Sequence, residues 1–189
     1  MNNFSELLNN LLLTSSKNKK VNLLTDFFTK VSIKNRAWAF CILTNRFEKK
    51  IINVAELKEL IKNKIDYDLF KYSYDYVGDL AETISLLWRN NNFKNSSLQL
   101  YELMESLTQK NNKETLIKKI ELFLNLSSEN QRYTILKILT GGLRVGVSNG
   151  LIKDSLSKSG VRSFLEIEEY WHGFKFPFID FFEWLEGNK

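Results

Sequence analysis

The 189-residue chain has one cysteine, one histidine and one proline. The cysteine, Cys41, lies inside the apolar run "AWAFCIL", so neither a disulfide framework nor a cysteine-based zinc site is possible. His172 has no second histidine or cysteine with which to share a metal ion, and we expect it to have a structural role. Metal and redox sites built on these residue types are therefore not expected.

Long apolar runs are also lacking. The run from Ala37 to Leu43 is too short to cross a bilayer, and the start "MNNFSELLNN" lacks the basic and apolar regions of a signal peptide. We therefore expect a cytoplasmic, monomeric protein with no membrane partner. The abundance of lysine, asparagine and isoleucine suggests an AT-rich bacterial genome, which would place the protein with the nucleoid.

What the sequence does have is helical periodicity. Apolar residues follow the spacing of an amphipathic helix at several places, among them Phe4, Leu7, Leu8, Leu11 and Leu12 near the start and Ile135, Leu136 and Leu139 further on. Asp79 with Glu82, and Ser128 with Gln131, have the spacing of a capping box at a helix start. No segment shows the sustained two-residue alternation, bounded by turn signals, that is typical of a β-strand. These patterns predict an all-α fold, a single compact domain (1–189) of roughly ten helices in two packed groups, joined by the polar stretch 89–97.

The charge is moderately positive, at +5, and "KNKK" (17–20) and "RFEKK" (46–50) are local basic clusters. A polyanionic partner bound by one face would use such clusters. Lysines scattered over helices would also simply keep the domain in solution, and charge alone leaves both interpretations open.

The stretch "GGLRVGVS" (141–148) has the glycine frame of a nucleotide-binding loop. Such a loop follows a β-strand and needs a lysine, whereas here the preceding residues have helical periodicity and Val147 takes the lysine's place. An NTP site is therefore excluded. Ser148 can instead cap a helix whose N-terminus attracts an anion, with Arg144 beside it as a phosphate donor. A plain connection between two helices is the competing interpretation.

Five segments of the chain resemble segments of one protein family, and they occur in the same order as in that family. The segment "LTGGLRVGVSNGLIKDSL" (139–156) resembles a signature of the N-terminal DNA-binding domain of ATP-dependent DNA ligases. "LLLTSSKNKKVNLLTDFF" (11–28) is similar to the opening segment of that family, and "WAFCILTNR" (38–46) to its third-helix region in the prokaryotic branch. "YDYVGDLAETISLL" (74–87) and "HGFKFPFIDFFEWL" (172–185) resemble two further segments, so the resemblance covers nearly the whole chain.

The resemblance implies a helical domain that binds nicked double-stranded DNA through the minor groove and the phosphate backbone, without reading base sequence. It would serve a ligase acting in DNA repair, replication or recombination. The residues implied to contact DNA fall in three segments. They are Thr14, Ser16 and Lys20; Gly78, Asp79, Leu80 and Ala81; and Gly142, Arg144, Gly146 and Ser148.

The chain departs from a complete ligase in one respect, because it has no K-x-[DHN]-G motif to carry the lysine that takes AMP. The resemblance therefore implies a chain that binds DNA and does not seal it. ATP and Mg²⁺ would belong to a separate nucleotidyltransferase domain, which with an oligonucleotide-binding (OB) domain would be its partner in the parent ligase. A helical protein-interaction module and a single-strand nucleic-acid-binding domain remain the alternatives.

Two further groups of residues are expected to be structural. The glutamates of "EIEEY" (166–170) are expected on the solvated face of a helix rather than as catalytic carboxylates. The C-terminal aromatics would stack on bases in a single-strand binder, but their density favours core packing. They are Phe174, Phe176, Phe178, Phe181, Phe182 and Trp184.

Overall fold

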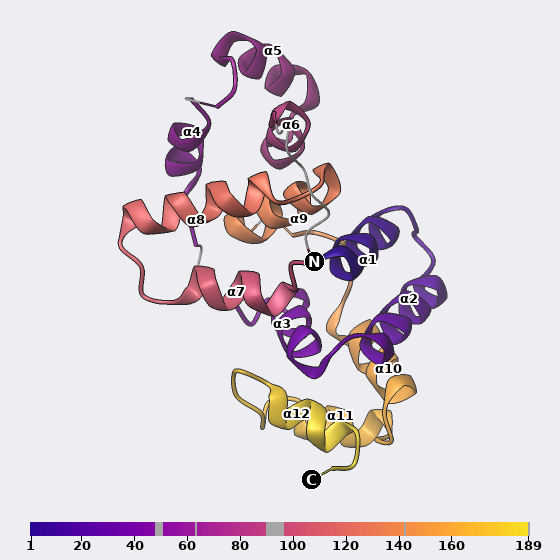
Figure 1. The fold of residues 1–189 in the computed structure, drawn as a ribbon. Helices are drawn as coiled ribbons and strands as arrows, with labels where there is room; N and C mark the ends of the chain where they lie inside the picture. The colour runs from indigo at the N-terminus through magenta and orange to yellow at the C-terminus, as the bar shows by residue number, and fades with distance from the viewer. Residues whose placement is uncertain (48–50, 63, 90–96, 142, 189) are drawn as a thin grey trace. The chain divides into compact units, whose positions relative to one another are not determined.

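The computed structural model of the chain describes residues 1–47, 51–62, 64–89, 97–141 and 143–188. Over these ranges it contains twelve α-helices and no β-strand (Figure 1). The all-α prediction is therefore confirmed, with two helices more than the rough count expected. None of the described helices is long and apolar enough to span a bilayer.

The helices are short, and polar caps define where many of them start. In chain order they are α1 (Asn2–Leu12), α2 (Lys17–Lys30), α3 (Ile33–Leu43), α4 (Val54–Lys62), α5 (Tyr67–Val77), α6 (Leu80–Leu87), α7 (Leu100–Thr108), α8 (Lys113–Asn125), α9 (Glu129–Thr140), α10 (Asn149–Ser159), α11 (Phe164–Tyr170) and α12 (Ile179–Leu185). The capping box of Ser128 and Gln131 is formed at the start of α9, as predicted. A second one, Ser163 with Glu166, starts α11, so Glu166 is a capping residue as well as a surface carboxylate.

The chain forms two compact units, and both are discontinuous in sequence. The terminal unit comprises the described residues within 2–48, 99–101 and 144–189, and the middle unit comprises Met1 and those within 49–98 and 102–143. Two groups of helices were expected, but the predicted division at 89–97 is wrong. Residues 90–96 lie outside the described ranges, and the helices before and after them contribute to both units. The grouping depends on which apolar side chains, distant in sequence, are buried against one another. The polarity of a local stretch does not indicate this.

In the terminal unit, α2 packs along α10, and α1 packs on α2 (Figure 1). Its aromatic core centres on Phe40 of α3, whose ring lies 5.0 Å from that of Phe181 and 5.3 Å from that of Trp171 between ring centroids. Phe178, Phe181 and Phe182 are buried, which confirms core packing for the middle of the C-terminal aromatic segment. Such rings supply much of the burial that stabilises so small a unit.

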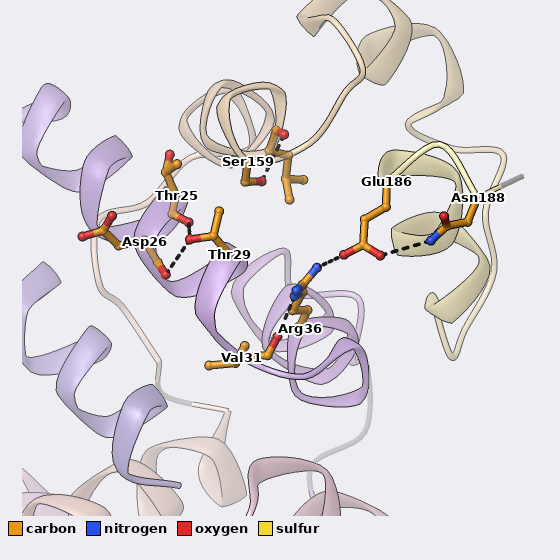
Figure 2. A network of polar contacts seen from close by, with 9 residues as sticks. Thr25, Asp26, Thr29, Val31, Arg36, Ser159, Glu186 and Asn188 are labelled. Carbon is orange, nitrogen blue, oxygen red and sulfur yellow. Dashed lines mark hydrogen bonds and ion pairs between the residues drawn. The ribbon is translucent and has the colours of Figure 1, made fainter.

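Polar contacts attach the C-terminal helix of this unit to α3. The Arg36 guanidinium donates to the Val31 carbonyl at 2.7 Å and forms an ion pair with Glu186, just after α12 (Figure 2). The guanidinium of Arg46 lies 4.8 Å from the centroid of Trp171 and donates to the carbonyl of that residue at 2.6 Å. These arginines fix the aromatic segment to residues far away in sequence.

In the middle unit, α6 packs on α9 and on α5, and α8 also contacts α9. The side chain of Arg132 in α9 is only 7% exposed. It donates to the carbonyl of Leu124 at 2.9 Å and to that of Trp88 at 3.0 Å. Trp88 in turn donates from Nε1 to Asn125 at 2.9 Å. A charge is tolerated here because backbone carbonyls solvate it in place of water.

Candidate nucleic-acid interface

The glycine-rich stretch connects two helices. α9 ends at Thr140, and Gly141 takes the left-handed conformation, with φ 68°, as its C-terminal cap. The helical environment that excluded a nucleotide-binding loop is confirmed. Gly142 lies outside the described residues.

The loop 143–148 alternates between buried and exposed side chains. Val145 is buried and Leu143 and Val147 are half-buried, whereas Arg144, Gly146 and Ser148 are exposed. Ser148 caps α10, where its Oγ accepts from the Leu151 N–H at 3.4 Å. The predicted helix start at Ser148 is confirmed. Arg144 and Ser148, the polar residues of this loop that are implied to contact DNA, are therefore accessible from solvent.

Lys20 fixes this loop from α2. Its ammonium donates to the carbonyls of Val145, at 2.8 Å, and Gly146, at 2.9 Å, and the residue is only 8% exposed. These bonds use two of the three N–H donors of the ammonium. The sequence pointed to Lys20 as a DNA contact, whereas in the structure it also holds the loop backbone in place.

Gly146 is required by the same contact. Its φ is +61°, a left-handed conformation that side chains with a Cβ rarely adopt, and an added Cβ would lie 2.7 Å from Lys20 Nζ. Glycine at this position therefore permits both the turn of the backbone and the close approach of the ammonium.

The start of α2 has a similar construction. Thr14 Oγ1 accepts from the Ser16 N–H at 3.2 Å, and Ser16, the N-cap, accepts from the Lys19 N–H at 3.4 Å. Ser16, Lys17 and Lys19 are exposed. Lys17 and Lys19 were not among the residues implied by the resemblance, although the basic run "KNKK" was a signal that pointed to them.

The starts of α2 and α10 are thus parts of one site in the terminal unit, because Lys20 bonds to the backbone just before the Ser148 cap. Neither helix has an acidic residue in its first turn. The positive end of each helix dipole is therefore not neutralised locally, and exposed Lys17, Lys19 and Arg144 add positive charge. An anion such as a phosphate would be attracted to each of the two helix starts.

The second implied segment, Gly78 to Ala81, lies in the middle unit. Gly78 ends α5 with φ 74°, and Asp79 caps α6, where its Oδ1 accepts from the Glu82 N–H at 2.9 Å. Among the described contacts only this half of the predicted capping box is formed. Leu80 and Ala81 are the first residues of the helix.

Asp79 also forms an ion pair with Lys137 of α9. Partial burial acts to raise the pKa of the Asp79 carboxyl, but the hydrogen bonds from Lys137 and from the α6 backbone prevail and hold that pKa below its ordinary value. The carboxylate therefore stays ionised at neutral pH, and Lys137 offsets its charge at the helix start. The structure brings the first implied segment together with Arg144, Gly146 and Ser148 in the terminal unit, and it places Gly78 to Ala81 in the other unit.

Two residues set aside at the sequence level have clear environments. Cys41 is buried, and burial raises the pKa of its thiol to about 11, against a smaller opposing effect of Arg46. His172 is exposed, and no group of three or more metal-ligating side chains is found in the described part of the chain.

Comparison with known proteins shows the family of this chain. No curated protein matches the chain significantly. The family model described as the DNA ligase N terminus matches residues 1–157, which include all three implied segments. The chain therefore belongs to the family of N-terminal domains of ATP-dependent DNA ligases.

Proposed function

We propose that this chain binds nicked double-stranded DNA through its phosphate backbone and minor groove, independently of base sequence, as the DNA-binding domain of an ATP-dependent DNA ligase. The observation that carries the proposal is the pair of helix starts at Ser16 and Ser148, joined by Lys20 and surrounded by exposed cations. Contacts of this kind position a duplex and read no sequence.

Each residue has a distinct role in the proposed interface. Arg144, exposed on the loop, presents a planar fork of donors that can bind two oxygens of one phosphate. Ser16 and Ser148 start the helices whose N-termini face the anions. Lys20 keeps the loop in the required conformation through the Val145 and Gly146 carbonyls, and its third N–H would donate to a phosphate.

The start of α6 would supply a further backbone contact from the middle unit. An acidic cap alone would repel a phosphate, but Lys137 compensates the charge of Asp79. The N–H groups of Leu80 and Ala81 would then meet the DNA backbone as the two units bind the same duplex. ATP, Mg²⁺ and the chemistry of sealing would belong to nucleotidyltransferase and OB domains, so this chain alone would bind and not ligate.

The test is fluorescence-anisotropy binding to nicked, intact and single-stranded DNA over a series of salt concentrations. If about four phosphates are contacted, log K should fall with log salt with a slope of roughly −3 to −4. Arg144→Ala should weaken duplex binding by roughly tenfold and reduce the magnitude of the slope by about 1. Lys175→Ala removes an exposed charge from the same unit outside both helix starts, and it should leave binding nearly unchanged.

The other outcomes identify the alternatives. Tighter binding to single strands, unaffected by Arg144→Ala, would indicate a single-strand-binding domain. No DNA binding even at low salt would refute the proposal and favour a protein-interaction module. Tighter binding to nicked than to intact duplex would show that this domain detects the break, whereas equal affinity would refute the nick-specific part of the proposal.

A further inference from the structure

A cavity in the middle unit is lined by residues other than those proposed to contact DNA. It has a volume of about 310 Å³ and is lined by residues of α4, of α5 and of the connection between them. Its floor consists of buried Ile61, Ile65 and Phe70. The ring of Tyr74 is stacked on that of Phe70, with 5.9 Å between centroids and 4° between planes, and extends the apolar wall.

The edge of the cavity is positively charged. Three exposed lysines, Lys58, Lys62 and Lys71, line it against one carboxylate, that of Asp75. The Lys58 ammonium lies 5.5 Å from the centroid of the Tyr74 ring, and Lys62 shares its charge with Glu59 on the surface. Lys71 has no ion pair or hydrogen bond among the described residues, so its charge is available to a ligand.

The residues that line the cavity favour an apolar side chain flanked by carboxylates as the ligand. The floor offers carbon atoms only, so a nucleobase placed there would lose the hydrogen bonds of its polar edge without compensation. An aromatic or branched apolar side chain has no hydrogen bonds to lose there, and it gains contact with three buried apolar residues. The lysines around the opening complement carboxylates on either side of such a side chain.

Exposed tyrosines next to the cavity enlarge the surface. Tyr67 at its edge is 60% exposed, and Tyr72 on α5 is 73% exposed. Tyrosine is enriched at protein interfaces because it offers a large apolar ring and one hydroxyl with little conformational freedom to lose.

We infer that the cavity between α4 and α5 binds an acidic peptide segment of a partner protein, with one aromatic or branched apolar side chain inserted between Phe70 and the two isoleucines. The proposal does not rest on the DNA interface, since the residues that line the cavity include neither Gly78 to Ala81 nor the residues of the terminal unit around Arg144 and Ser148. The domain would thereby recruit a second protein while bound to DNA.

The test starts from a phage-displayed library of random short peptides, selected on the full chain. The sequences recovered should share acidic residues flanking an aromatic or branched apolar residue. A synthetic peptide of that consensus, labelled for anisotropy, should bind roughly tenfold more weakly to the double variant Lys58→Glu, Lys71→Glu. Replacement of its apolar residue by serine should weaken binding to the wild-type chain by a similar factor.

Controls separate this site from general attraction of charge. Lys110→Glu, an exposed position of the same unit outside the cavity, should leave peptide affinity unchanged, and circular dichroism should show that all variants are folded. Selection without an acidic and apolar consensus would overturn the proposal, as would equal weakening by Lys110→Glu. Stronger competition by oligo(dT) than by the peptide, lost in the double variant, would make the cavity a nucleic-acid site instead.

Discussion

Substitution of Gly146 by alanine tests the geometry of the proposed DNA interface most directly. The left-handed backbone, with φ +61°, costs an alanine roughly 1–2 kcal/mol. The new Cβ would also lie 2.7 Å from the Lys20 ammonium, which must move away from two carbonyls. Partial loss of these charged hydrogen bonds adds about 1–2 kcal/mol, so Gly146→Ala should lower the free energy of unfolding by roughly 2–4 kcal/mol.

Gly78 provides a matched comparison. Its φ of +74° imposes a similar backbone cost on alanine, but a Cβ there would meet nothing within 4 Å. Gly78→Ala should therefore cost only the roughly 1–2 kcal/mol of the backbone. In a Lys20→Met background, where the ammonium is absent, Gly146→Ala should fall to this same cost.

Urea unfolding followed by tryptophan fluorescence suits Gly146→Ala, since Trp38, Trp171 and Trp184 lie in the terminal unit with Gly146. Gly78 lies in the middle unit, where Trp88 is the corresponding probe. Circular dichroism would follow both units and reveal whether they unfold in separate transitions. The reasoning would be refuted if Gly146→Ala cost no more than Gly78→Ala, or if its additional cost persisted in the Lys20→Met background. In the first case Lys20 would not hold the loop, and in the second something other than its ammonium would oppose the Cβ.

Three further predictions concern Arg132, Asp79 and Cys41. Arg132→Met, which removes two hydrogen bonds to buried carbonyls, should destabilise the middle unit by about 2–4 kcal/mol in urea unfolding, and a neutral effect would show that these bonds contribute little. The pKa of Asp79 is lower in the folded state than in the unfolded chain. The stability that its ionised carboxylate contributes should therefore be fully present above the ordinary pKa of about 4, and it should be lost as the pH falls through the pKa of the folded state. Asp79→Ala should cost roughly 1–2 kcal/mol at pH 7 in thermal unfolding and progressively less as the pH is lowered below about 4, and a cost that did not fall with pH would contradict the assignment. With a pKa of about 11, Cys41 should react with a disulfide reagent at pH 8 about 10²-fold more slowly than a free thiol, and rapid labelling of the folded protein would refute its burial.

Local features of the fold could be predicted from the sequence because they depend on neighbouring residues. The apolar stripes and the Ser128 cap fix where helices form, and the alternation around Arg144 shows which side chains of the loop are buried. The second capping box, Ser163 with Glu166, was also readable, but its glutamate belongs to a run that looks like an ordinary solvated face. Glu166 fits both the solvated face of a helix and a capping box, and the first interpretation hid the second.

Interactions between distant residues could not be predicted in this way. Lys20 and Val145 are 125 positions apart, and nothing in the run "KNKK" distinguishes the buried lysine from the exposed ones. The burial of Arg132 depends likewise on carbonyls at the ends of two other helices. The division into units was missed for the same reason, since it follows from which apolar faces meet and not from the polarity of a connection.

The interleaved order of the two units has a consequence for synthesis. α1, α2 and α3 emerge from the ribosome first, but α10 to α12, which complete their unit, follow only after the whole middle unit. At 5–20 residues per second, the roughly 100 intervening residues delay their arrival by about 5–20 s. During that interval the middle unit can fold, while Phe28 and Phe40 lack the aromatic partners of the last helices. The nascent chain therefore exposes the future core of its proposed DNA-binding unit longest, and this is the period in which a chaperone would be most needed.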